Sequence, residues 1–203
     1  MTSRHKPMPQ QWDWVTRFLH FGLAITVTLQ LLNSLVIEKP KPGHPLSGFE
    51  ALMFDIHEWL GITAFAIVLL HWAWSLWGLG GYGVRHLLPW NREGRAEVVT
   101  GLREVFKGRL SSGGPKDKLS GLIHGLGLLA VLGAATTGAV LFFFMPEDGK
   151  LTMLTGAASE LHKFISTFVW IYWGGHVGMG LLHYFVSRDE ALPRMFSLSP
   201  SKK

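Results

Sequence analysis

Cysteine is absent from this 203-residue chain, and charged residues are scarce, at 16% of the total. Without cysteine the chain forms no disulfide framework, no thiolate-held iron–sulfur cluster and no zinc ribbon. It also lacks the C-x-x-C-H run that attaches a c-type haem covalently. A soluble domain ordinarily carries about a quarter charged residues. Redox chemistry would therefore need a cofactor held by other ligands, and the shortage of charge indicates lipid around much of the chain.

We expect no cleavable signal peptide, because the start, MTSRHKPMPQQWDW, is polar and leads into a long apolar segment. Four apolar segments exceed the roughly 18 residues of a membrane-spanning helix. They cover about 14–37, 53–79, 119–145 and 160–187. Tryptophans lie near segment ends, where aromatic belts occur: Trp12, Trp14, Trp72, Trp74, Trp77 and Trp90. We predict an all-α, integral membrane four-helix bundle that forms a single domain over residues 1–203.

Lysine and arginine are distributed unevenly between the two sides that these spans define. Fifteen of the 19 lie in the N-terminal tail and first helical turn, in the 79–118 loop or in the C-terminal tail. The other side holds the remaining four: Lys39, Lys41, Lys150 and Lys163. The positive-inside rule therefore predicts that both termini and the long loop are cytoplasmic. The net charge of +5 expresses this asymmetry, and we expect no nucleic-acid partner.

The 79–118 loop is too long for a tight connection, and part of it has helical spacing. Its apolar residues recur at helical intervals: Val98, Val99, Leu102, Val105, Phe106 and Leu110. A Gly-Gly-Pro run breaks this segment before the third span. We predict an amphipathic helix that lies on the cytoplasmic face of the membrane.

Seven of the ten histidines fall inside the predicted spans: His20, His57, His71, His124, His162, His176 and His183. Ionisable residues inside a membrane are costly and usually face the bundle interior as part of a site. For any one histidine, the plain alternative is a neutral imidazole bonded to a neighbouring backbone carbonyl. Seven in four helices favour a shared chemical role.

The spacing of two histidine pairs sharpens this interpretation. His57/His71 and His162/His176 are each 14 residues apart. That spacing rises about 21 Å and falls about 40° short of four helical turns, so each helix presents two imidazoles on nearly one face. The second and fourth spans both begin at the outer side, which places His57 and His162 at one outer level. His20, His71 and His176 share an inner level.

Two layers of facing imidazoles suit two b-type haems, each held by neutral imidazoles on both faces of its iron. Small residues near the histidines leave room for a wide macrocycle: Gly22, Gly61, Gly174, Gly175, Gly178 and Gly180. Such glycines equally permit close helix packing without a cofactor. The acids in or beside the spans, Asp55, Glu58 and Glu160, lie at the outer surface and do not make a di-iron carboxylate site. At the inner level, spacing leaves both His20 and His71 open as ligands.

An early histidine in the first and second spans, with His-x13-His in the fourth, resembles the bacterial di-haem b-type cytochromes. That family includes cytochrome b561, stand-alone superoxide oxidases and the membrane subunits of respiratory formate dehydrogenases and nickel–iron hydrogenases. The ending LLHYFVSRDEALPRMF is similar to the close of the stand-alone members. The resemblance implies a bacterial inner-membrane protein in which His57 and His162 hold the outer haem. It implies that His20 and His176 hold the inner haem.

The other three histidines take less definite roles from the resemblance. His71 stands where related chains often have an arginine, so it is either a partner of a haem propionate or an alternative ligand to His20. His124 and His183 either line a quinone pocket, where an imidazole bonds a carbonyl oxygen and passes protons, or surround the inner haem.

The function that the resemblance implies is transmembrane electron transfer between a periplasmic-side donor and the membrane quinone pool, in either direction. A redox protein or a catalytic subunit would be the partner. One alternative is a superoxide:quinone oxidoreductase, which needs positive charge at the outer mouth to steer the anion. Acids outnumber lysines on that side. A second alternative is a haem-free membrane transporter or scaffold, and no catalytic residue stands out.

Overall fold

The computed structural model describes residues 12–39, 46–78, 83–109, 117–146, 149–187 and 195. Within these ranges all regular structure is helical, which confirms the all-α prediction. The elements are α1 (Trp14–Asn33), α2 (Phe49–Leu76), α3 (Val84–Leu87), α4 (Arg92–Phe106), α5 (Lys118–Phe144), α6 (Met153–Leu182) and the π-helical turn η1 (His183–Ser187).

Side-chain caps fix where α1 and α5 begin. Asp13 accepts a hydrogen bond from the backbone N–H of Thr16 at 2.9 Å. Asp117 accepts one from the N–H of Leu119, also at 2.9 Å. The first turn of a helix leaves its N–H groups without intrahelical partners, and a carboxylate at the cap satisfies one or two of them. Both starts agree with the predicted spans to within a residue.

The starts of α2 and α6 come earlier than the apolar pattern predicts. Helix α2 begins at Phe49 and α6 at Met153, whereas the predicted spans begin at about 53 and 160. In α6 the cause is a capping box, because the hydroxyls of Thr152 and Thr155 each accept the other residue's backbone N–H. The cap begins the helix in polar sequence, so hydrophobicity alone places its start too late.

Three helices in the described part of the chain are long and apolar enough to cross a membrane: α1, α2 and α5. These confirm three of the four predicted spans as candidates. Helix α6 has 30 residues, which is sufficient length. Its histidines, glycines and serine/threonine residues dilute the apolar side chains, so its crossing of the membrane stays a prediction.

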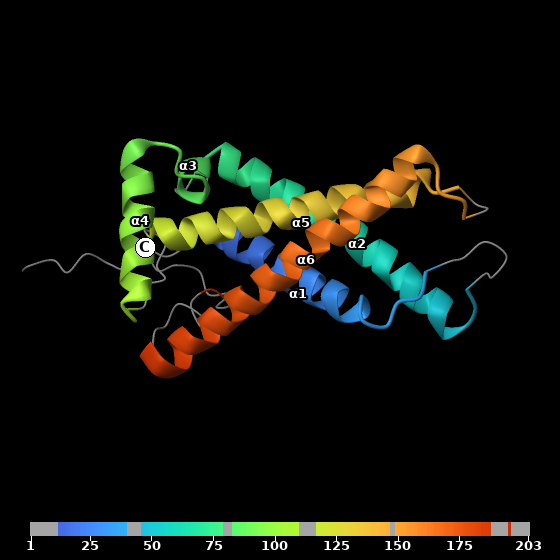
Figure 1. Cartoon of the computed structure of the whole chain (residues 1–203), viewed down its shortest axis with the longest axis horizontal. Helices are drawn as coiled ribbons and strands as arrows, with labels where there is room; N and C mark the ends of the chain where they lie inside the picture. Colours follow the sequence, from blue (N-terminus) through green and yellow to red (C-terminus); the bar gives the residue numbers. More distant parts are fainter. Residues whose placement is uncertain are drawn as a thin grey trace, which may run out of the picture.

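The long helices alternate in direction (Figure 1). Helix α1 packs along α2, α2 packs on α5, and α5 packs along α6. Helices α3 and α4 lie at the end of the molecule where α1 and α5 begin and α2 ends. Helix α6 makes at most isolated backbone contacts with α1 and α2, and it diverges from α5 toward its own C-terminus. The α6 backbone therefore stays apart from the two helices whose histidines face it.

The protein core runs between the long helices and includes Leu23, Leu31, Val68, Trp72, Leu87, Val131 and Val169. Trp72 is only 9% exposed, so its assignment to an interfacial aromatic belt is wrong. It lies one helical turn beyond Val68, which is fully buried, and therefore on the same inward face of α2. Large apolar side chains are exposed along the outside of the spans, as expected where lipid covers them.

The predicted amphipathic helix is present as α4, which ends at Phe106, and its position on the cytoplasmic membrane face stays a prediction. Leu110 and the Gly-Gly-Pro run lie outside the described residues. Its short neighbour α3 packs directly on α5 because Gly121 and Gly125 present no side chain. A Cβ on Gly125 would lie 2.2 Å from the carbonyl oxygen of Leu87. This Gly-x-x-x-Gly spacing is a known device for close helix contact in membranes.

Candidate functional site

Four of the seven histidines within the predicted spans meet as two pairs near opposite ends of the bundle. The ring centres of His57 on α2 and His162 on α6 are 6.4 Å apart. Those of His20 on α1 and His176 on α6 are 6.0 Å apart. Each pair therefore bridges α6 to a helix with which its backbone has little contact.

These separations suit a single metal ion between two imidazoles. Metal–nitrogen bonds of about 2 Å on each side place the nitrogens about 4 Å apart and the ring centres about 6 Å apart. In the described part of the chain, no group of three or more His, Asp or Glu side chains is arranged to hold a metal ion. The pairs thus match a cofactor that supplies the remaining ligands itself.

The ring of His57 is oriented by α1. Its Nδ1 lies 3.2 Å from Oδ1 of Asn33, and Nδ2 of that amide donates to the Met53 carbonyl at 3.1 Å. Since the amide nitrogen is used by Met53, the amide oxygen faces the imidazole and His57 Nδ1–H is the donor. Gln30 on the same helix donates from Nε2 to the carbonyl of His57 at 2.8 Å.

His162 is oriented by α5. Its Nδ1 lies 2.9 Å from the carbonyl oxygen of Ala134 and 3.1 Å from the hydroxyl of Thr137. A carbonyl accepts only, so Nδ1 carries the proton here too. Gly138 permits this close approach, because a Cβ there would lie 3.3 Å from His162 Cε1.

Both rings of the His57/His162 pair, the predicted outer pair, therefore use Nδ1 as the donor and keep the Nε2 lone pair available. An imidazole that ligates a metal through one nitrogen usually donates its other N–H to a carbonyl or carboxylate, which fixes the tautomer. His162 does bond a backbone carbonyl, which was the alternative to a role as a metal ligand. The bond uses Nδ1, however, and leaves Nε2 free to bind a metal. The outer pair fits axial ligation of a haem iron.

The His20/His176 pair, the predicted inner pair, is surrounded by aromatic and imidazole rings. His176 stacks on Tyr172 of the same helix, with ring centres 5.3 Å apart and an interplanar angle of 18°. The ring centres of His124 and His176 are 4.8 Å apart, which is too short for imidazoles on opposite sides of one metal ion. His124 donates from Nδ1 to the Ser120 carbonyl at 2.6 Å. The 6.0 Å pair of His20 and His176 is thus the one with room for an iron.

The remaining predicted site residues occupy separate positions. His71 is buried on α2, and its Nδ1 has no hydrogen-bond partner from another residue. His183 is half-buried at the start of η1. Gly22 lies against the side chain of Ile67 and Gly61 against that of Gln30, so both serve helix packing. A Cβ added at Gly174, Gly175 or Gly178 would meet no atom within 4 Å.

Several side chains of the site were missed by reasoning from the sequence. Gln30 and Asn33 are amides three residues apart in an apolar span, which is a detectable signal because polar groups in membranes usually have a partner. Tyr172 lies one turn before His176 and packs on Gly127, where a Cβ would lie 2.1 Å from the tyrosine ring. Thr137 gave no signal, since threonine is common in such helices.

His86 on α3, outside the spans, was also missed. A Cβ on Gly121 would lie 2.7 Å from its Nε2, so the imidazole lies directly on α5. Burial, followed by the charges of Lys118 and His124, lowers the pKa of His86 to about 4. The imidazole is therefore neutral at pH 7, beside the inner end of the bundle.

An apolar helical bundle with paired imidazoles near both ends has the fold and ligand set of a membrane-bound redox protein. A family model for prokaryotic cytochrome b561 matches residues 11–198, and the chain belongs to this family. Neither the comparison with curated proteins nor the comparison with solved structures finds a match. Membership implies a membrane protein that binds b-type haem and transfers electrons across the membrane.

Proposed function

We propose that this chain, as one domain, transfers electrons through two b-type haems between a periplasmic-side donor and the membrane quinone pool. The observation that carries the proposal is the presence of two histidine pairs with ring-centre separations of 6.4 and 6.0 Å near opposite ends of one bundle. Together with the positive-inside rule, they support a four-span protein in the bacterial inner membrane with both termini cytoplasmic.

In this proposal His57 and His162 hold the outer haem, and His20 and His176 hold the inner haem. When bound, the haems supply a one-electron iron couple whose potential depends on axial ligands, their hydrogen bonds and burial. Asn33 and Ala134 accept from Nδ1 of the outer imidazoles, which fixes their tautomer and aims Nε2 at the iron. Tyr172 and His124 fix the ring of His176 from two directions.

His71 is assigned to a propionate of the inner haem. His20 makes the 6.0 Å pair with His176, which leaves His71 as the buried imidazole without another residue's acceptor at Nδ1. A buried polar atom costs free energy unless it is hydrogen-bonded, and a carboxylate would satisfy it.

The quinone is assigned to the inner side, next to His124 and His183. The Nδ1 bond of His124 to Ser120 leaves Nε2 to interact with a quinone oxygen. His183 follows on a π-helical turn, a distortion that is frequent at functional sites. The electron donor on the other side is a redox protein or a catalytic subunit.

Superoxide is the less favoured donor. An anionic substrate would need net positive charge at the outer mouth. Lys163, one of four cations on that side, is ion-paired with Glu160 of the same helix. The pair leaves less positive charge to attract superoxide, which supports a protein donor.

The test is haem stoichiometry with a reduced-minus-oxidised spectrum on the detergent-purified chain. We expect two b-type haems in the wild type, and one each in the His57→Ala/His162→Ala and His20→Ala/His176→Ala double variants. His71→Ala and His183→Ala serve as controls and should keep both. Two haems retained after loss of His57 and His162 would contradict the pairing. If folded wild-type protein, expressed with ample haem, contained no haem, the transporter or scaffold alternative would be favoured.

A further inference from the structure

One side of α4 packs on the spans, and the neighbouring side carries exposed apolar residues. Gly101 faces α5, where a Cβ would lie 3.2 Å from Cβ of Leu119. Val99, Leu102 and Phe106 are 46%, 45% and 83% exposed. At about 100° per residue these three lie within roughly 60° of one another around the helix. We call them the apolar stripe of α4.

The stripe lies at the level where the spans leave the membrane. Helix α1 begins with Trp14, α2 is followed by Trp77, and Trp90 precedes α4; all three indoles are more than half exposed. Tryptophan is enriched at membrane–water interfaces. Figure 1 shows α4 running across the first part of α5 at this end of the molecule. Its level and direction are those of a helix lying in the membrane plane.

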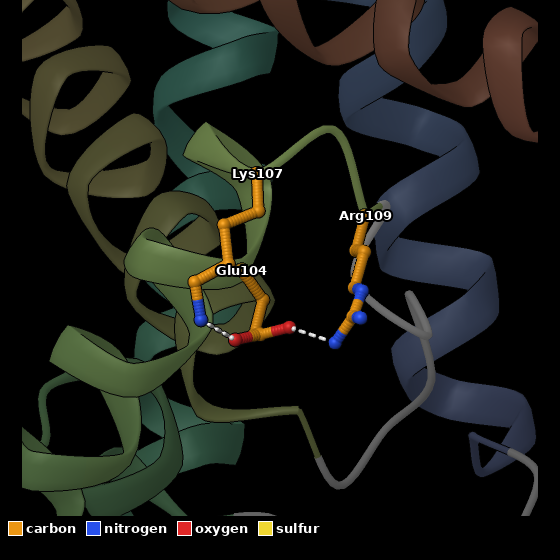
Figure 2. Close-up of polar contacts among 3 residues, drawn as sticks. All are labelled: Glu104, Lys107 and Arg109. Carbon is orange, nitrogen blue, oxygen red and sulfur yellow. Dashed lines mark hydrogen bonds and ion pairs between the residues drawn. The ribbon is translucent and has the colours of Figure 1, made fainter.

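Most of the other exposed residues of α4 are charged. Glu104 accepts hydrogen bonds from Lys107 Nζ at 2.7 Å and from Arg109 Nη1 at 2.9 Å (Figure 2). These bonds lower the pKa of Glu104, so the carboxylate is ionised at neutral pH and offsets one of the two positive charges near the helix end. Three arginines are exposed beside the stripe, Arg92, Arg95 and Arg103, whereas the exposed Glu93 and Glu97 share the opposite arc with Glu104.

An apolar stripe bordered by arginines, at the level of the membrane surface, is suited to bind anionic lipid. Arginine binds phosphate oxygens through its planar fork, and its aliphatic stem can lie along apolar surface. Basic amphipathic helices bind anionic membrane surfaces with their apolar side in the boundary between headgroups and acyl chains. We propose that α4 binds the lipid surface in this manner, with the stripe among the acyl chains and the three arginines at anionic headgroups.

The absence of cysteine permits a clean test. Single cysteines are placed at Val99, Leu102 and Phe106, and at Thr100 as the matched control. Thr100 is exposed on the opposite, polar arc, and its hydroxyl bonds only within the helix, to Ala96. Each full-length variant is labelled with bimane in vesicles of phosphatidylcholine and phosphatidylglycerol. Quenching by brominated lipid and by aqueous iodide is then compared.

We expect brominated lipid to quench the three stripe labels several-fold more than the Thr100 label, with the reverse order for iodide. Stripe labels as accessible to iodide as the Thr100 label would place the face in water and overturn the proposal. Labels shielded from both quenchers would overturn it in favour of a second copy or another protein. A circular dichroism spectrum of each labelled variant verifies that the bundle is folded.

The arginine contribution is measured separately with an Arg92→Gln/Arg95→Gln/Arg103→Gln variant that also carries the Phe106 label. Raising the phosphatidylglycerol fraction should increase lipid quenching with the arginines present and have little effect without them. Equal responses would overturn the headgroup contact. None of these readouts depends on haem, so their failure is distinguishable from failure of the proposed function.

Discussion

His57 on α2 donates from Nδ1 to Oδ1 of Asn33 on α1, at 3.2 Å. Asn33 is only 8% exposed, and its amide nitrogen is held by the Met53 carbonyl. Gln30 meanwhile bonds the His57 carbonyl. Helix α1 therefore holds both the ring and the backbone of His57, which we propose as an outer haem ligand. The ring of its partner His162 is held mainly by the Ala134 carbonyl, which substitution cannot remove.

Replacing Asn33 should change the outer haem alone. Asn33→Leu removes the acceptor, makes His57 a weaker electron donor and should raise the outer midpoint potential, with haem binding about tenfold weaker. Asn33→Asp strengthens the acceptor and should lower the potential. Redox titration measures both, and Ser34→Ala, which loses only a bond to Leu31 of the same helix, is the control. Equal outer midpoint potentials in the wild type and the three variants would show that Asn33 does not tune the outer haem.

Thr137→Val should have a smaller effect than Asn33→Leu. The hydroxyl of Thr137 is 3.1 Å from His162 Nδ1, but the Ala134 carbonyl remains as the shorter acceptor at 2.9 Å. We expect a slight change in outer potential and full haem content by redox titration. Thr136→Val, on the exposed side of α5, controls for loss of a threonine hydroxyl. A shift larger than that of Asn33→Leu would mean that the hydroxyl is the main acceptor.

Gly127→Ala should disturb the inner site. The new Cβ would lie 2.1 Å from the Tyr172 ring, which stacks on His176. Displacing the tyrosine should cost about 1–3 kcal/mol of stability and alter the inner haem spectrum while the outer stays unchanged. Gly174→Ala is the control, since its Cβ would meet nothing within 4 Å. Thermal unfolding and the low-temperature α-band measure the two effects; identical behaviour of both variants would contradict the prediction.

His86 should make stability depend on acid pH. Its pKa of about 4 in the folded protein is below the ordinary value of 6.5, so the unfolded chain binds its proton first as pH falls. The stabilising effect is complete above about pH 6.5 and is lost as pH falls toward 4. Because His86 is only half-buried and solvent screens part of the effect, the wild type should lose about 1 kcal/mol more than His86→Gln between pH 7 and pH 5. Thermal melts in detergent at both pH values measure this difference, and parallel losses would refute it.

Local patterns in the chain were sufficient for much of this molecule. Apolar length predicted four membrane spans, of which three are confirmed as candidates, because a helix satisfies its own backbone and needs no partner to be recognised. Fourteen-residue spacing put His57 and His162 at one predicted level and His71 and His176 at another, since helical rise and rotation depend only on separation along one element. It left His20 and His71 both open beside His176, and the family resemblance favoured His20. The ring centres of His57 and His162, and of His20 and His176, lie about 6 Å apart.

Contacts between distant segments were decided only by tertiary packing. Asn33 and His57 are 24 residues apart, and Ala134 and His162 are 28 apart, so no periodicity within one helix relates them. Trp72 is in the core rather than at the interface because of how α2 is rotated against its neighbours. Hydrophobicity and spacing specify which face of each helix is apolar or carries a ligand. How two helices pack against each other decides the tautomer of a proposed histidine ligand. It also decides which ring lies beside that histidine and how much space surrounds it.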